Sequence, residues 1–137
     1  MTPSRVAEYF YDRVLSVTMQ WERTLERLRK MPQHWRLVYT LCWLQAEVDN
    51  GGHEQFFDNC RRRFDDVTEA DLRFIGAGRF LELFMEARRF YDCAPADHAD
   101  RIPQIEPLDN AFYNQKKSLH TLVGEYVLSH LADYRLE

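Results

Sequence analysis

The sequence predicts an all-α protein: a single compact domain of about six helices around a central helix, with no β-sheet. Apolar residues recur at steps of three and four along most of the chain, which is the period of a helix that buries one face. No segment shows a convincing β-strand pattern. The 137 residues match one ordinary domain, residues 1–137, and no change in composition marks a second one.

The first predicted element is an N-terminal helix over residues 3–30. Thr2 before Pro3 suits an N-cap followed by a proline in the first turn, and Pro32 separates this helix from the next. A kink near residues 16–18 is an alternative to a straight helix. The apolar face consists of Val6, Phe10, Val14, Val17, Trp21, Leu25 and Leu28.

The central helix is predicted over residues 33–49, because two apolar stripes cover most of its circumference. Asn50, Gly51 and Gly52 end it, since these residue types tolerate the left-handed conformation common at helix C-termini. We expect a tight corner there, followed by a short helix over residues 53–63 that presents its phenylalanines inward and its arginines to water.

The second half of the chain alternates polar and amphipathic segments. Residues 65–71 are predicted to be a polar connection, in which Thr68 and Asp71 form a capping pair. An amphipathic stretch follows to Tyr91 and is expected to bend at its glycines. Residues 93–107 hold three prolines and no apolar period, which is typical of a loop. Helical patterns resume at residue 108, as a short helix and then a last one.

Composition excludes several classes of protein. The longest uncharged stretch in the middle, residues 37–46, is about half of what a membrane-spanning helix needs. Glu8 and Asp12 interrupt the region where a signal peptide would need an apolar run. Three cysteines without a CxxC pair indicate reduced thiols rather than a disulfide framework. We therefore expect a cytoplasmic protein without a membrane segment.

Recognisable catalytic motifs do not occur in the sequence. It has no nucleophile elbow, no phosphate-binding glycine loop and no HExxH zinc helix. The five histidines lack the short spacing that would place two ligands on one metal ion. We predict no catalytic residue, no cofactor and no metal site.

An acidic cluster between residues 47 and 58 has two interpretations. Paired carboxylates can do acid and base work, which keeps a small hydrolase as an alternative. The structural interpretation is that polar side chains hydrogen-bond the exposed backbone groups of the helix-glycine-helix corner and tie its two helices together. The side chains placed to do so are Glu47, Asn50, Gln55 and Asn59.

Acidic residues gather in two parts of the sequence, at the corner and in the predicted loop. The net charge of −4 is too mild to name a partner. If both groups lie on one side, they form an electronegative face for a basic, nucleic-acid-binding protein; scattered solubilising charge is the alternative. The candidate partner-binding residues are Glu47, Asp49, Glu54, Asp58, Asp92, Asp97, Asp100, Glu106 and Asp109.

The segment LCWLQAEVDNGGHEQFFDN, residues 41–59, resembles the signature of a bacterial family of small helical domains of unknown function, whose named representative is a DNA mimic protein. The resemblance continues through FIGAGRFLELFMEA and LDNAFYNQKKSLHTLVGEYV, so it covers about residues 32–137 and leaves the N-terminal helix as an addition. The signature positions are Trp43, Glu47, Val48, Asn50, Gly51, Gly52, Gln55, Phe56, Phe57 and Asn59.

This resemblance implies an all-α fold without known catalytic activity. It also implies an acidic surface that imitates the phosphates of duplex DNA and occupies the DNA-binding face of a transcription factor. His53 departs from the family pattern, which usually has an aromatic residue such as phenylalanine there. A histidine at this position implies either weaker packing of the corner or a response to pH.

Together these observations predict a non-catalytic inhibitor or regulator that binds a basic protein, either a transcription regulator or a toxin, and not nucleic acid directly or a membrane. An immunity protein that neutralises a secreted toxin is the main alternative to DNA mimicry. A homodimer is a further alternative, in which exposed aromatics such as Tyr9, Tyr11 or Tyr134 meet across a two-fold axis.

Overall fold

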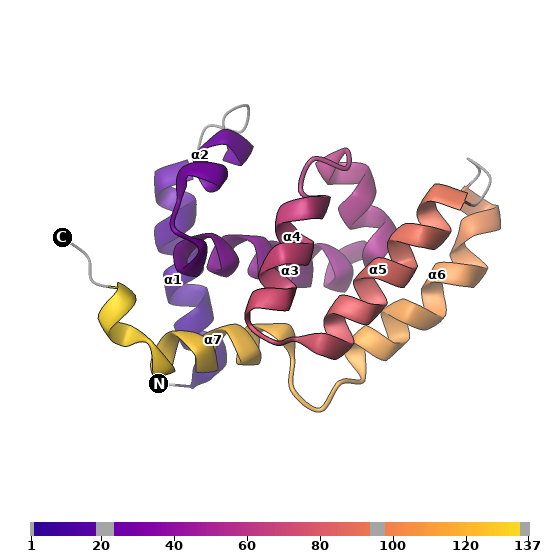
Figure 1. Cartoon of the computed structure of the whole chain (residues 1–137). Helices are drawn as coiled ribbons and strands as arrows, with labels where there is room; N and C mark the ends of the chain where they lie inside the picture. The colour runs from indigo at the N-terminus through magenta and orange to yellow at the C-terminus, as the bar shows by residue number, and fades with distance from the viewer. Residues whose placement is uncertain (1, 19–23, 94–97, 135–137) are drawn as a thin grey trace.

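The computed structural model describes residues 2–18, 24–93 and 98–134, and within these ranges it contains helices and no strand (Figure 1). This confirms the predicted all-α class. The elements in chain order are α1 (Pro3–Thr18), α2 (Thr24–Lys30), α3 (Gln33–Cys60), α4 (Asp65–Phe74), α5 (Gly78–Cys93), α6 (His98–Tyr113), α7 (Leu119–Ser129) and the short 3-10 helix η2 (Leu131–Tyr134).

The longest helix, α3, is the centre of the fold, as predicted. It contacts α1, α4, α5, α6 and α7, and Figure 1 shows it running across the molecule from α1 towards α5 and α6. One predicted apolar stripe, Leu37, Leu41, Leu44 and Val48, is fully buried. In the other, Val38, Tyr39 and Cys42 are buried, Trp35 is half-buried and Ala46 is exposed. A helix with two buried stripes and five neighbouring helices packed on it is a core helix.

Of the N-terminal helix predicted over residues 3–30, α1 covers residues 3–18 and α2 covers residues 24–30; residues 19–23 lie outside the described part of the chain. The residues of the predicted kink, 16–18, are assigned to α1. Helix α1 packs on α3 and α7. Its approach to α7 is so close that a Cβ at Gly124 would overlap with the backbone carbonyl of Pro3. The N-terminal segment is therefore built into the core rather than attached to it.

Of the three aromatics proposed for a dimer interface, only one is exposed. The side chain of Tyr9 is 49% exposed, Tyr11 is half-buried, and Tyr134 is buried at 3%. The Tyr134 hydroxyl donates to the backbone carbonyl of His34, and its ring packs on Phe10. Tyr134 is thus part of the core, which corrects its assignment to an exposed dimer surface.

The polar segment 65–71 is not a connection but most of α4, and Thr68 lies inside this helix rather than at its start. The polar residues belong there because each carboxylate has a partner on a neighbouring segment, and α4 turns Asp71 towards α3. Asp71 is fully buried and accepts hydrogen bonds from Arg36 at 2.7 Å and from Thr40 at 2.7 Å. Polarity alone therefore misplaced this helix, since its buried face carries a paired carboxylate.

The amphipathic stretch expected to bend at its glycines is interrupted between α4 and α5. Gly76, with a φ of 72°, lies at the end of α4. Two backbone hydrogen bonds close the helix there: the N–H of Gly76 donates to the carbonyl of Arg73, and the N–H of Ala77 donates to the carbonyl of Leu72. This pair of bonds is the Schellman arrangement, which favours glycine at the left-handed position. The stretch therefore forms two helices rather than one bent helix.

The loop predicted over residues 93–107 is wrong for its second half, which lies in α6. Pro103 and Pro107 are inside that helix and both are exposed. Because they are four residues apart, they share one helical face, and the hydrogen bonds that they cannot donate are lost on the side open to water. Ile105 and Phe112 on another face are buried. Packing on α3 and α5 outweighs the cost of the prolines.

Candidate functional site: the glycine corner and the acidic residues around it

The two halves of α3 meet at the glycine corner, formed by Gly51 and Gly52, whose backbone angles are not helical. A buried carboxylate joins the halves: Glu47 accepts hydrogen bonds from Gln55 at 3.1 Å and from Asn59 at 2.8 Å. Amide N–H groups therefore satisfy the carboxylate, which stabilises the bend.

The other polar signature residues complete this bonding. Asn50 donates to the side-chain carbonyl of Gln55 at 3.2 Å. A Cβ on Gly51 would overlap with that same carbonyl, so the corner has no room for a side chain there. The structure thus supports the structural interpretation, with one correction: these side chains bind one another and not the backbone groups of the corner.

The backbone at the start of the second half of α3 is bound from another helix. The carboxylate of Asp109 on α6 accepts from the backbone N–H of His53 at 2.9 Å and lies 2.6 Å from the Nδ1 atom of its ring. A carboxylate at this position caps the half-helix and opposes its positive dipole end. Gly52, with a φ of 78°, leaves the space that the carboxylate fills.

His53 is fully buried and packs edge-on against Phe112, with 5.5 Å between the ring centres. In the described residues its Nε2 atom has no hydrogen-bond partner. The ring therefore fills an aromatic position of the core while its Nδ1 atom contacts Asp109. The tight contact with Phe112 and Asp109 gives no sign of loose packing at the corner; a response to pH stays a prediction.

The predicted acidic residues do not form one continuous face. Glu47 and Glu54 are buried and Asp109 is only 16% exposed, so these three are not available on an acidic surface. Asp49 and Glu106 are exposed. Asp97 and the side chain of Asp100 lie outside the described residues.

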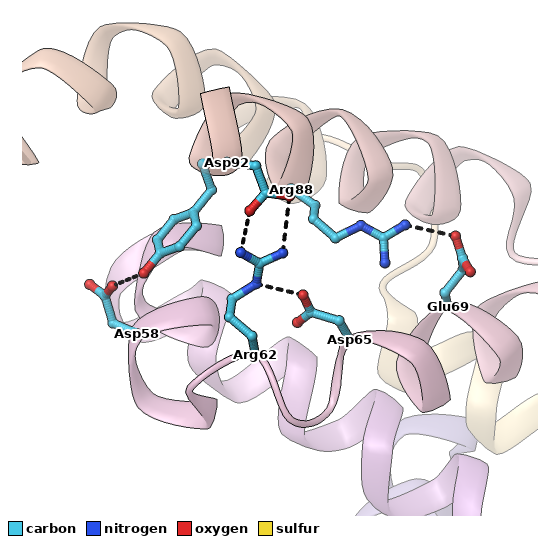
Figure 2. A network of polar contacts seen from close by, with 7 residues as sticks. Asp58, Arg62, Asp65, Glu69, Arg88 and Asp92 are labelled. Carbon is cyan, nitrogen blue, oxygen red and sulfur yellow. Dashed lines mark hydrogen bonds and ion pairs between the residues drawn. The ribbon is translucent and has the colours of Figure 1, made fainter. Parts of the chain in front are cut away.

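Asp58 and Asp92 are both engaged by neighbouring side chains: Asp92 pairs with Arg62, and Asp58 accepts from Tyr91, the residue before Asp92. Figure 2 shows Arg62 directed at both carboxylate oxygens of Asp92 and, through its Nε atom, at Asp65. The hydroxyl of Tyr91 donates to Asp58 at 2.5 Å. We call these five residues the Arg62 cluster. Its arginine offsets the negative charge that the sequence placed here.

Burial and pairing act in opposite directions in the Arg62 cluster. The hydrogen bond from Arg62 lowers the pKa of Asp92, whereas burial raises the pKa of Asp65. The Arg62 guanidinium also lies over the rings of Phe57 and Tyr91, at 5.4 and 5.2 Å from their centres. This cation–π attraction adds to the ion pairs that hold Arg62 in place. The cluster therefore joins the end of α3 to α5.

Two exposed carboxylates that sequence reasoning did not select lie on α1, which packs on α3, the helix that carries Asp49. Glu8 and Asp12 are exposed on α1. His120 has a pKa that is lowered by burial, and both Glu8 and Asp49 act against that shift. Glu8 and Asp12 likewise both act on the pKa of Cys42, whose main shift is upward because of burial. We call the exposed carboxylates Glu8 and Asp12 of α1 and Asp49 of α3 the acidic surface. The packing of α1 on α3 joins the two helices that carry them, and no local pattern indicated this packing.

The described residues contain no group of three or more histidine, cysteine or acidic side chains that could hold a metal ion. Among the described helices, none combines the length and apolar character required to cross a membrane. Two of the thiols are buried, and burial raises the pKa of Cys60 to about 12, so that thiol stays protonated and inert.

The fold and the site define a class of small all-α proteins in which a glycine-bent central helix is fastened by buried polar side chains. Within this class, the chain belongs to the DMP19-like family: the family model described as DMP19-like protein matches residues 29–130. This is a DNA mimic family, which agrees with the resemblance found in the sequence. No curated protein and no solved structure matches the chain.

Proposed function

We propose that this protein is a non-catalytic inhibitor or regulator that binds a basic, nucleic-acid-binding protein through the acidic surface of Glu8, Asp12 and Asp49. Membership in a DNA mimic family supports a protein-binding role. The observation that carries the proposal is that these three carboxylates are exposed on α1 and α3, two helices that pack on each other and on α7. The described residues show no ion pair for any of the three.

Two of the other predicted acids, Asp92 and Asp109, are less suitable for a partner. Asp92 is already paired with Arg62, and Asp109 is bound to the corner. Asp49 accepts from the neutral amide of Gln45 at 2.9 Å, so its hydrogen-bond partner is not a cation. Unpaired surface charge attracts an oppositely charged protein over distance and increases its rate of association, more than it increases final affinity.

The hydrolase alternative relied on the carboxylates of the corner, and the state of Glu47 does not support it. Catalysis there needs Glu47 to face a substrate, but its carboxylate is buried and bound to Gln55 and Asn59. An immunity protein uses the same chemistry as a DNA mimic, because a toxin with a basic surface would also bind the acidic surface. The identity of the captured partner separates these two roles.

The test is affinity capture with the tagged protein, followed by elution with increasing salt and mass spectrometry. The variant Glu8→Gln, Asp12→Asn, Asp49→Asn removes the acidic surface. The control Glu26→Gln, Glu82→Gln, Glu86→Gln removes three exposed carboxylates on α2 and α5 and gives the same net charge. We expect the wild type and the control to capture a basic DNA-binding protein that salt releases, and the first variant to lose it. Recovery of a toxin would support immunity instead. Equal capture by both variants would refute the acidic surface as the binding site.

A further inference from the structure

A cleft of about 260 Å³ lies where the turn between α4 and α5 meets the connection between α6 and α7. Both segments lie at the lower edge of the molecule in Figure 1. The apolar part of its lining comes from Ala77, Phe80 and Leu122. This volume is below the range of about 300 to 1,000 Å³ typical of small-molecule sites and is closer to the size of one or two side chains.

All charged side chains that line the cleft are basic: Arg79, Lys116 and Lys117. Arg79 and Lys117 each form an exposed ion pair, with Glu82 at 3.1 Å and Glu125 at 2.8 Å. Exposed pairs of this kind contribute at most about 1 kcal/mol, so they leave the cations able to turn to a ligand. A cleft with cations around apolar groups differs from the rest of this acidic chain, whose net charge is −4.

Gly78 keeps one side of the cleft open. A Cβ added there would meet no atom within 4 Å, and its φ is not left-handed, so neither packing nor backbone conformation requires a glycine. Gly76 differs, because its φ of 72° closes α4. The open space at Gly78 allows a ligand to approach the first turn of α5; the nearest acid in sequence, Glu82, is exposed and pairs with Arg79.

An exposed aromatic residue lies next to the cleft in the sequence and in the fold. Phe74, two residues before the cleft residue Gly76, is 48% exposed. Its ring lies 5.8 Å from that of Tyr126 on α7, one turn beyond the cleft residue Leu122. Tyr126 in turn stacks on His130. This row of rings extends the apolar surface from the cleft along α7. If a peptide places one side chain in the cleft, its neighbouring residues would lie against these rings.

We propose that this cleft binds an acidic peptide segment that inserts one apolar side chain. The apolar lining requires an apolar group, and the surrounding cations require carboxylates beside it in the same ligand. An inorganic anion satisfies only the second condition. A single-stranded nucleic acid would use the rings and cations but leaves the small apolar lining unfilled. None of the residues that line the cleft belongs to the acidic surface, and failure of this proposal would leave the proposed function unchanged.

The test uses a fluorescein-labelled peptide of sequence Asp-Glu-Phe-Asp-Glu and fluorescence anisotropy with the full chain. We expect Lys116→Glu to weaken binding about tenfold, as fits loss and reversal of a cation beside carboxylates. Lys30→Glu, an exposed lysine on α2, is the control with the same change of charge and should bind like the wild type. Replacing the peptide's phenylalanine by serine should also abolish most of the binding.

Gly78→Ala separates binding from folding, since the added methyl group enters open space. It should leave the melting temperature unchanged or slightly higher and weaken peptide binding several-fold. Equal binding by Lys116→Glu and Lys30→Glu would overturn the proposal. So would no peptide binding by the wild type, or displacement of the peptide by inorganic phosphate or an oligothymidine as readily as by unlabelled peptide.

Discussion

The glycine corner and the Arg62 cluster both join helices through carboxylates, but they do so in different surroundings. At the corner, Glu47 is buried and bound by neutral amides. In the Arg62 cluster, the side chain of Asp92 is 47% exposed and is paired with a cation. A buried carboxylate without partners is costly, whereas an exposed one remains hydrated. We therefore infer that the corner carries much more of the stability than the Arg62 cluster does.

The largest expected effect is at Gly52. Gly52→Ala should lower the free energy of unfolding by about 3 to 5 kcal/mol, because its backbone region is nearly restricted to glycine and the new methyl group overlaps with Asp109. Chemical denaturation measures this change. Gly78→Ala is the matched control and should cost nothing. Similar values for both variants would contradict our account of the corner.

Glu47→Ala should have the next largest effect, about 2 to 3 kcal/mol, because Gln55 and Asn59 lose the acceptor that satisfies their amides. Glu86→Ala on α5, where the carboxylate forms only an exposed ion pair, should change stability by less than about 0.5 kcal/mol. If the Glu86 variant is the more damaging of the two, buried bonding at the corner is not what holds α3 together.

A smaller effect of opposite sign is expected beside the Arg62 cluster. Arg61 has a φ of 49°, which is left-handed and unfavourable for a residue with a side chain. Arg61→Gly should therefore raise the free energy of unfolding by about 1 kcal/mol. Arg63→Gly removes the same charge where φ is not positive and should lower stability instead. Thermal unfolding of the two variants should move in opposite directions.

The smallest effect is a pH dependence at Asp92. Its pKa is lowered in the folded protein by the bond from Arg62, so this bond stabilises the fold above the unfolded pKa of about 3.9. That contribution is lost as pH falls through the lower, folded pKa. The difference in unfolding free energy between the wild type and Asp92→Asn should therefore be largest near neutral pH and shrink below about pH 4. A difference that stays constant down to pH 2 would show that the pairing has no such role.

Particular elements show how far the sequence alone could predict the fold. The period of the apolar residues located α3 and its corner, because core burial and glycine conformation are local properties of the chain. The same reasoning placed α4 in a polar connection, since the partners of Asp71 lie in α3, more than thirty residues earlier. It also placed the first part of α6 in a loop, because prolines disfavour a helix and the burial of Ile105 and Phe112, which stabilises this helix, is visible only in the fold.

The candidate site divides in the same way. The bonding of Glu47 with Gln55 and Asn59 was close to predictable, because eight and twelve residues separate these partners across one bend. The cap that Asp109 supplies to His53 joins residues 56 positions apart. The sequence analysis placed this carboxylate on an acidic surface, and no local pattern indicated that it binds a backbone N–H within the fold.

The sequence by itself determined the all-α class, the central helix, the glycine corner and the resemblance to a DNA mimic family. These features depend on the apolar period, on glycines that permit a bend and on an ordered series of residues. All three are local properties of the sequence. Only the tertiary structure decided which carboxylates form hydrogen bonds or ion pairs within the fold and which stay exposed. The reason is that the state of a charge depends on its burial and on the groups that folding brings within hydrogen-bonding distance.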